Sequence, residues 1–177
     1  MRIISGKYKR RVITPPKNLP VRPTTDMAKE SLFNILGNYL DFEDKTALDL
    51  FAGTGNISYE LVSRGCSSVT SVDKDFGCVK FINDTAHKLN MPELHSIRMD
   101  VFRYLGSLRQ KFDIIFADPP YQLDNITDVS SLVFENELLN SDGWLIVEHP
   151  REIDFSESLH FYEHRKYGRV NFSFFHI

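Results

Sequence analysis

The chain has 177 residues, of which 42% are hydrophobic and 25% are charged. This length and composition are typical of one soluble domain with a sizeable core, and they leave too little chain for two comfortable domains. No apolar run approaches the length of a membrane span, and the basic start lacks the apolar stretch of a signal peptide. We therefore expect a cytoplasmic protein. Cys66 and Cys78 have neither the number nor the spacing of a disulfide framework or zinc site, which predicts buried free thiols.

The net charge of −3 hides an uneven distribution of charge along the chain. Residues 1–25 contain seven Lys or Arg and no acid, whereas the remaining residues carry 14 basic and 24 acidic side chains. We interpret residues 1–25 as a basic N-terminal arm and residues 26–177 as the main domain. A basic arm on an acidic body favours an anionic partner, nucleic acid first, although many basic tails are only solvated.

The arm begins with the pattern of a β-hairpin or an extended segment over residues 1–14, with a turn at Ser5-Gly6. Basic residues flank Tyr8, so that phosphate contacts and one stacking ring would lie together. Residues 15–20 contain three prolines and predict a stiff, extended connector. The residues of the arm that we expect to contact nucleic acid are Arg2, Lys7, Tyr8, Lys9, Arg10, Arg11 and Arg22.

After the arm, predicted strands and helices alternate. Capping oxygens at Thr24, Thr25 and Asp26 precede a predicted helix over 27–40. Strands are predicted at 45–51, 68–72, 95–99, 112–117 and 143–148, and helices at 56–64, 76–89 and 126–139. This alternation predicts a parallel, doubly wound sheet with right-handed crossovers. From Leu159, two strand-like runs around Gly168 predict a hairpin that adds an antiparallel strand at the end of the sheet.

A glycine-containing loop, residues 51–55, joins the first predicted strand to a helix. Glycine permits a tight turn there and lets the backbone approach a nucleotide-like ligand. The next strand ends at Asp73, 18 residues after Gly55, which is close to the spacing for an acid on a ribose hydroxyl. The loop lacks the lysine of a phosphate-binding loop, and Ser58 stands where a third glycine would help a pyrophosphate site. A nucleoside cofactor without phosphates therefore fits better than NAD or ATP.

An aspartate stands at or beside the end of each of four predicted strands: Asp49, Asp73, Asp100 and Asp118. A single strand-end aspartate is usually a cap or a turn residue. Because parallel strands end at one edge of a sheet, four of them are better explained as a site lined with hydrogen-bond acceptors. Such a site suits a ligand with amino groups, hydroxyl groups and positive charge, and it needs no metal.

The apolar strand at 112–117 stops at Asp118-Pro119-Pro120-Tyr121, where two prolines without N–H groups end the sheet in a stiff loop. These residues suit chemistry on a flat aromatic amine, whose nitrogen is a poor nucleophile because its lone pair is delocalised. Asp118 and the Pro119 carbonyl would accept the two N–H bonds of the amine, and Tyr121 would stack on the base. The alternative interpretation is a proline-rich turn with a capping aspartate.

Residues 49–56 resemble the first motif of the Rossmann-like methyltransferases that use S-adenosylmethionine, and residues 118–121 resemble their amino-methylating motif. Residues 1–8 and 22–36 resemble the RsmD family, whose members methylate a guanine N2 of bacterial small-subunit (16S) ribosomal RNA. The resemblance spans nearly the whole chain. The departures are Ser58 in place of glycine, Arg10 in place of a small residue and Lys29 in place of arginine.

The resemblance implies an α/β fold with a seven-stranded, mostly parallel sheet, an antiparallel last strand and helices on both faces. It implies that Asp49, Gly53 and Gly55 surround the methionine part of the cofactor, that Asp73 binds the ribose, and that Asp100 and the Val101 amide bind the adenine. The full set expected to bind S-adenosylmethionine is Asp49, Phe51, Gly53, Gly55, Asp73, Lys74, Asp100, Val101 and Asp118, and the catalytic set is Asp118, Pro119 and Tyr121.

We therefore expect a monomeric enzyme that methylates a guanine N2 in 16S ribosomal RNA, either as naked RNA or in an assembling 30S particle. A DNA adenine-N6 or cytosine-N4 methyltransferase is a second hypothesis, ranked lower because the chain has no room for a separate target-recognition domain. Methylation of a protein glutamine amide ranks lower still. A third hypothesis is a non-catalytic RNA-binding assembly factor, which the four intact aspartates argue against.

Overall fold

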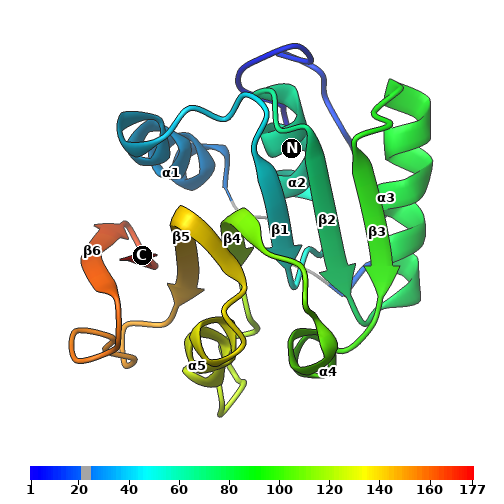
Figure 1. The fold of residues 1–177 in the computed structure, drawn as a ribbon. Coiled ribbons are helices and arrows are strands. Elements are labelled where there is room, and N and C mark those ends of the chain that lie inside the picture. The colour runs from blue at the N-terminus through cyan, green and yellow to red at the C-terminus, as the bar shows by residue number, and fades with distance from the viewer. Residues whose placement is uncertain (21–24) are drawn as a thin grey trace.

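The computed structural model describes residues 1–20 and 25–177, which form a seven-stranded sheet with the order β3-β2-β1-β4-β5-β7-β6 (Figure 1). The strands are β1 (Thr46–Leu50), β2 (Ser68–Asp73), β3 (Leu94–Arg98), β4 (Phe112–Ala117), β5 (Leu139–His149), β6 (Phe161–Tyr167) and β7 (Val170–His176). The helices are α1 (Asp26–Tyr39), α2 (Asn56–Ser63), α3 (Phe76–Leu89), α4 (Val101–Ser107) and α5 (Asp128–Glu135). None of the helices in these described ranges is both long enough and apolar enough to span a bilayer.

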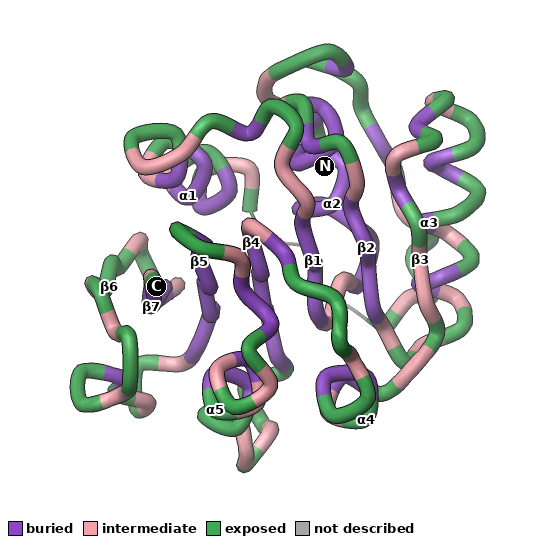
Figure 2. Tube along the Cα trace, in the orientation of Figure 1, coloured by how far each residue is buried: buried purple, intermediate pink, exposed green. Residues whose placement is uncertain are grey.

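Helices cover both faces of the sheet, as the doubly wound pattern predicted. Successive side chains of a strand point to opposite faces, and β4 shows this with Ile114 and Phe116 on one face and Ile115 and Ala117 on the other. The first face packs against α1, α2, α3 and residues 1–13, whereas the second packs against α4 and α5. Figure 2 shows β1, β2, β4 and β5 buried along most of their length between these layers.

The last strand, β7, is antiparallel to its neighbours, which confirms that part of the prediction. The predicted hairpin around Gly168 is also present at the end of the sheet, formed by β6 and β7. Within it, β7 lies next to β5 and β6 is the outer strand. The burial patterns give the reason. The five central residues of β7 are all buried, whereas β6 is exposed along most of its length. The more apolar strand of the hairpin therefore takes the interior position, and β6 forms the edge.

The helix predicted over 126–139 is shorter than expected, since α5 ends at Glu135. Glu137 takes a left-handed conformation with φ 52°, and the Leu138 amide donates to the Val133 carbonyl at 3.0 Å, which closes the helix end. The following residues already belong to β5, where Leu139 pairs with Phe112. Leu138 and Leu139 are thus buried at the start of β5 and not on the face of a helix. The spacing of apolar residues alone does not distinguish these two arrangements.

The N-terminal segment (residues 1–13) forms no regular strand, so the predicted β-hairpin is not confirmed, but its two limbs pair in antiparallel fashion around a bridge between Arg2 and Val12. The Ile3 amide donates to the Arg11 carbonyl and the Ile13 amide to the Met1 carbonyl, both at 3.0 Å. It closes as a loop against the end of α2. Gly6 has φ +79°, and a Cβ on this residue would fall 1.7 Å from the Ser63 carbonyl oxygen, so the close approach requires glycine. Ile3 and Ile13 are buried in the same core as α1 and α2. The division into an arm and a domain stays a prediction.

Both cysteines are buried and free, as the sequence predicted. Burial raises the pKa of each thiol to about 12. Because only the thiolate is strongly nucleophilic, neither Cys66 nor Cys78 is a candidate for nucleophilic chemistry at neutral pH.

Candidate active site

The four strand-end aspartates lie along one edge of the sheet. Asp49 is the penultimate residue of β1 and Asp73 the last residue of β2, while Asp100 follows β3 by two residues and Asp118 directly follows β4. These four strands are neighbours in the order β3-β2-β1-β4 and run in parallel, so their carboxyl ends coincide. The acceptor-lined edge predicted from the spacing is therefore present, at the position where open α/β sheets bind ligands.

The glycine loop (residues 51–55) turns back sharply between β1 and α2. Phe51, Gly53 and Gly55 all have positive φ, of 58°, 54° and 78°. At Gly55 a Cβ would lie 2.9 Å from both the Tyr59 ring and the Ile82 side chain, so a larger residue would have to displace this packing. Gly55 is also the N-cap of α2, which brings the amide-rich start of that helix to the same edge as the aspartates.

Asp73 fixes the glycine loop and still has acceptor capacity. One carboxylate oxygen accepts the Gly53 amide at 2.8 Å, and the other accepts the Asp75 amide at 2.8 Å. Each oxygen keeps a further lone pair, which can accept a hydroxyl of a bound ligand. Of its predicted neighbours in the cofactor set, Lys74 is exposed, and Phe51 is half-buried against the Phe102 ring.

Asp49 is 2% exposed and depends on Ser58 for a hydrogen bond. The Ser58 hydroxyl donates to an Asp49 oxygen at 2.5 Å and lies 2.6 Å from the Ser71 hydroxyl. Burial, and to a smaller extent the Asp73 charge, raise the pKa of Asp49 to about 7, against the stabilising hydrogen bonds from Ser58. Ser58, which departs from the pattern of the family that the sequence resembles, therefore supports the aspartate, a role that was not predicted from the sequence.

We expect Asp49 to make the stability of the ligand-free protein pH-dependent. Its folded pKa is raised above its unfolded value of about 4, so its contribution to stability is fully present below about pH 4 and is lost as the pH rises through about 7. The loss has an upper limit of about 4 kcal/mol. Asp49→Asn should flatten this part of the profile of unfolding free energy, measured by urea titration at a series of pH values. Exposed Asp124→Asn is the matched control, and equal slopes for Asp49→Asn and wild type would contradict the assignment.

The Asp-Pro-Pro-Tyr loop (residues 118–121) starts where β4 ends. The Asp118 amide donates to the Leu50 carbonyl at 3.3 Å, which ties the loop to the end of β1 and hence to the glycine loop. Pro119 is buried and Pro120 exposed. Tyr121 is 42% exposed, and its hydroxyl donates to a Glu148 carboxylate oxygen at 3.0 Å. The predicted carboxylate, carbonyl and ring are thus held together at the sheet edge.

Glu148 belongs to this site, although the sequence analysis did not select it. The register between β4 and β5 pairs Ala117 with Val147, so that Asp118 and Glu148 are the next residues at the carboxyl ends of two adjacent parallel strands. Burial and the Glu148 charge hold the pKa of Asp118 well above its usual range, and burial also raises the pKa of Glu148. The feature of the sequence that could have indicated Glu148 is its position directly after the apolar run at 144–147, where a predicted strand ends.

Asp100 and Val101 lie at the start of α4. Asp100 is exposed and caps the helix, since its carboxylate accepts the Arg103 amide at 3.1 Å. Val101 is buried as the first helical residue. Their assignment to the adenine stays a prediction, and their place next to the end of β3 is compatible with it.

The residues predicted to contact nucleic acid are placed differently from one another. Tyr8 is buried, and its hydroxyl donates to the Asn90 carbonyl at 2.7 Å, so it offers no free ring face to a base. The stacking prediction for Tyr8 is therefore wrong in this conformation, because the ring anchors the segment to the core. Arg22 lies outside the described residues. Exposed basic residues of the segment are Arg2, Lys7, Lys9, Arg10 and Arg11.

Two of these basic residues, Lys7 and Lys9, lie on the loop that packs against the end of α2, away from the candidate active site. The Lys7 amide donates to the carbonyl of Ser63, the last residue of α2, whereas Asn56 begins α2 beside the glycine loop. A helix of this length spans about 12 Å. Figure 1 accordingly shows the blue N-terminal loop at the end of the sheet where β1 and β2 begin. An RNA that contacts both sites must follow the length of the molecule.

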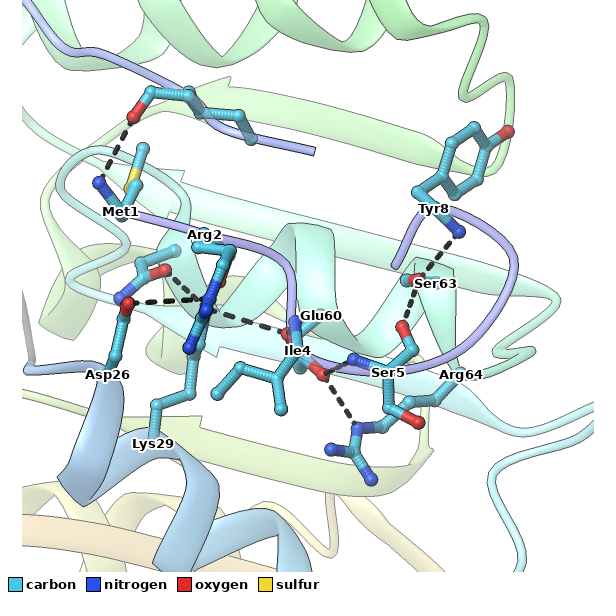
Figure 3. Close-up of polar contacts among 12 residues, drawn as sticks. Met1, Arg2, Ile4, Ser5, Tyr8, Asp26, Lys29, Glu60, Ser63 and Arg64 are labelled. Atoms are coloured by element: carbon cyan, nitrogen blue, oxygen red, sulfur yellow. Dashed lines mark hydrogen bonds and ion pairs between the residues drawn. The ribbon is translucent and has the colours of Figure 1, made fainter. Parts of the chain in front are cut away.

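A buried ionic network fixes the N-terminal segment to α1 and α2 (Figure 3). Lys29 of α1 is fully buried, and its ammonium donates to the Arg2 carbonyl at 2.6 Å and to the Asn56 side chain at 2.8 Å. It lies 3.5 Å from the carboxylate of Glu60. That carboxylate also accepts the Ile4 and Ser5 amides and the Arg64 side chain, at 2.8, 3.0 and 2.9 Å. Burial lowers the pKa of Lys29, and the Glu60 charge opposes this effect.

Comparison with known proteins places this arrangement in a family. Residues 1–176 match the family described as "Conserved hypothetical protein 95". The chain is 35% identical over 163 residues to the putative rRNA methyltransferase YlbH of Bacillus subtilis, with 90% of this chain and 88% of that protein covered. It is 27% identical over 148 residues to ribosomal RNA small subunit methyltransferase D of Escherichia coli, with coverage of 84% and 74%.

Solved structures give the same result for the fold. The structure described as the putative methyltransferase yhhF from Escherichia coli has a TM-score of 0.85 and 25% identity, and covers 99% of this chain and 97% of that one. A Thermus thermophilus 16S rRNA N2 methyltransferase in complex with AdoMet and guanosine has a TM-score of 0.69 and 21% identity, with 89% of this chain and 45% of that one covered. By the match over nearly its whole length, the chain belongs to the Conserved hypothetical protein 95 family, which is the RsmD family.

Proposed function

We propose that this protein transfers a methyl group from S-adenosylmethionine to the N2 amino group of a guanine in small-subunit ribosomal RNA, and that it acts as a monomer. The observation that carries the proposal is the Asp-Pro-Pro-Tyr loop, tied through the Asp118 amide to the end of β1 and so held beside the glycine loop. Membership of the RsmD family and the named activities of its relatives support it.

The residues at the sheet edge fit S-adenosylmethionine. That cofactor, when bound, supplies a methyl group on a positively charged sulfur. Its ammonium, ribose hydroxyls and adenine amino group all need hydrogen-bond acceptors, and the edge presents aspartates at the ends of β1, β2 and β3. The bent glycine loop leaves room for close approach of the ligand. We assign Asp49 to the amino acid part, Asp73 to the ribose and Asp100 to the adenine.

Asp118 and the Pro119 carbonyl are the groups that we assign to the target amine. Two acceptors on its N–H bonds orient the amine and favour the pyramidal geometry in which the nitrogen lone pair is free. The partly exposed Tyr121 ring offers a stacking surface for the guanine. A guanine inside a helix cannot reach this edge, so the target must be unpaired or flipped out of its stack.

The exposed basic residues of the N-terminal segment are assigned to RNA phosphates. Replacing Lys7, Lys9, Arg10 and Arg11 with serine should weaken RNA binding and lower the slope of log affinity against log salt by about 3 to 4. Because Lys7 and Lys9 lie at the other end of α2 from the glycine loop, and none of the four side chains is assigned to the cofactor or the amine, the rate of methyl transfer at saturating RNA should change little. Filter binding over a salt series measures the slope, and an unchanged slope would remove this segment from the RNA-binding surface.

Two further basic residues lie at the same edge of the sheet as the active site, and their contribution to RNA binding can be compared with that of the N-terminal segment. The pairing of Asn171 with His149 and with Lys166 places the β6–β7 turn at the edge where β4 and β5 end. Lys166, near the end of β6, and Arg169, in the turn, are exposed. In the same salt series, a Lys166→Ser/Arg169→Ser variant tests whether RNA is held nearer to the Asp-Pro-Pro-Tyr loop than to the N-terminal segment.

The function is tested by transfer of labelled methyl from S-adenosylmethionine to naked ribosomal RNA, partly assembled small subunits and duplex DNA, followed by nucleoside analysis. N2-methylguanine from either RNA preparation is the expected product, and the better substrate shows when in assembly the enzyme acts. Label in N6-methyladenine or N4-methylcytosine of DNA would support a DNA methyltransferase instead. Calorimetry that shows no binding of S-adenosylmethionine would favour a non-catalytic assembly factor.

A further inference from the structure

Two carboxyl groups meet at the end of β4 and β5. Asp118 and Glu148 each follow a paired residue at the carboxyl ends of these neighbouring strands, and the Glu148 charge acts on the Asp118 carboxyl. Glu148 is only 6% exposed. One of its oxygens accepts the Tyr121 hydroxyl at 3.0 Å, and the other oxygen is buried without a conventional donor. Two ionised carboxylates side by side repel each other, so this arrangement favours a proton held between them.

In the part of the chain that the structure describes, no positive charge near the pair compensates two ionised carboxylates. The groups that act on Asp118 are Glu148 on β5 and Asp49 on β1, both acidic, and the neutral hydroxyl of Tyr121 faces Glu148. Within residues 1–20 and 25–177, no lysine, arginine or histidine forms an ion pair with Asp118 or Glu148. Without a cation, two neighbouring carboxyl groups, of which Glu148 is buried and Asp118 half-buried, lower their energy by keeping one proton and one negative charge.

We propose that Asp118 and Glu148 act as a carboxyl pair with one shared proton, in which Glu148 donates to Asp118 and so positions it for the target amine. Glu148 is then a positioning residue, since it acts through Asp118 and through the Tyr121 hydroxyl. The inference rests on the proposed function, because it deepens the role of Asp118 in that reaction. On this proposal, the negative charge that accepts the N–H of the target amine is shared by Asp118 and Glu148.

The pair also accounts for the proton that the reaction releases. The amino nitrogen uses its lone pair to form a bond to the methyl carbon, while the methyl–sulfur bond breaks and its electrons stay on sulfur. The nitrogen then holds a positive charge and gives up one of its protons. The ionised oxygen of the pair accepts that proton, so the pair is briefly neutral until one proton returns to water with product release. The single negative charge of the resting pair thus opposes the charge that develops on nitrogen.

Substitutions at Glu148 separate a shared proton from simple packing. Glu148→Gln keeps the shape and offers a permanent N–H to Asp118, so we expect methyl transfer within about fivefold of wild type at neutral pH. Glu148→Ala removes the donor and the partner of Tyr121, and we expect kcat to fall by at least about 50-fold with little change in KM for the cofactor. Exposed Glu152→Gln, four residues later, is the matched control.

The distinguishing readout is the pH profile of single-turnover methyl transfer. In wild type, alkaline pH removes the shared proton, the two carboxylates repel, and the rate falls. In Glu148→Gln the amide does not titrate, so this alkaline fall should disappear. Ionisation of the guanine itself would act equally in both proteins. A Glu148→Gln profile that keeps the wild-type alkaline fall, or a Glu148→Gln rate as low as that of Glu148→Ala, would overturn the proposal.

A second readout does not depend on activity. In ligand-free protein labelled with carboxyl-13C glutamate, the NMR signal that Glu148→Gln removes should titrate at higher pH than ordinary glutamates. In Asp118→Asn the same signal should titrate differently, because its coupled partner is gone. A Glu148 signal that titrates in the ordinary acidic range, and is unaffected by Asp118→Asn, would refute the pair. If the Glu148 titration depends on Asp118 in this way but the wild-type protein methylates no RNA, the proposed function fails and the carboxyl pair stands.

Discussion

Replacing Asp118 with alanine is expected to lower kcat for methyl transfer by about a hundredfold to a thousandfold. Asp118 is the carboxylate of the Asp-Pro-Pro-Tyr loop and lies next to Glu148 at the carboxyl ends of β4 and β5. Alanine removes the acceptor that orients the target amine and the charge that opposes the positive charge on nitrogen. The aspartates of β1, β2 and β3 are untouched, so the dissociation constant for S-adenosylmethionine should stay within about threefold of wild type.

The measurement pairs calorimetric binding of S-adenosylmethionine with single-turnover methyl transfer at saturating RNA. Exposed Asp124→Ala, six residues further along the same connection, is the matched control and should behave like wild type in both assays. A turnover rate near that of wild type in Asp118→Ala would contradict the mechanism. A large loss of cofactor binding would instead assign Asp118 to the cofactor.

The second large effect is expected at the buried ionic network. Glu60→Ala should reduce the free energy of unfolding by about 3 to 5 kcal/mol, because it leaves the Lys29 ammonium buried without its counter-charge. The same change also removes the acceptor of the Ile4 and Ser5 amides. The N-terminal segment should therefore detach from α2 before the rest of the protein unfolds.

Urea unfolding measures the loss of stability, and limited proteolysis followed by mass spectrometry locates the first cleavage. Glu135→Ala, which truncates an exposed glutamate near the end of α5, is the matched control and should change the free energy of unfolding by less than about 0.5 kcal/mol. A Glu60→Ala protein within about 1 kcal/mol of wild type would show that Glu60 contributes little net stability. Early cleavage outside residues 1–13 would contradict the expected detachment.

Local sequence patterns were sufficient to predict the strands, turns and strand-end aspartates that form the site. The helix predicted at 76–89 and the strand predicted at 112–117 have the bounds that α3 and β4 show. Glycine turns, proline stops and strand-end acids are each encoded within a few residues, so the edge with Asp49, Asp73 and Asp118 follows from the order of the elements.

Contacts set by strand pairing or by the packing of distant elements were not predictable in this way. Glu148 lies beside Asp118 only because β5 pairs with β4 in one particular register. Glu60 and Lys29 come from two helices that are separate in the sequence, and each one alone looks like an ordinary charge on a helix. Tyr8 shows the converse error, since its basic neighbours indicated exposure while its ring packs in the core.

The central claim is that this chain methylates a guanine N2 in small-subunit ribosomal RNA. The most direct measurement treats small subunits from cells that lack this gene with the purified protein and labelled S-adenosylmethionine, followed by digestion and nucleoside mass spectrometry. We expect label in N2-methylguanine alone, close to a single methyl group per particle, and an initial rate of labelling at least about a hundredfold lower with Asp118→Ala. Folded wild-type protein that binds the cofactor but leaves these particles and their extracted RNA without N2-methylguanine would contradict the claim.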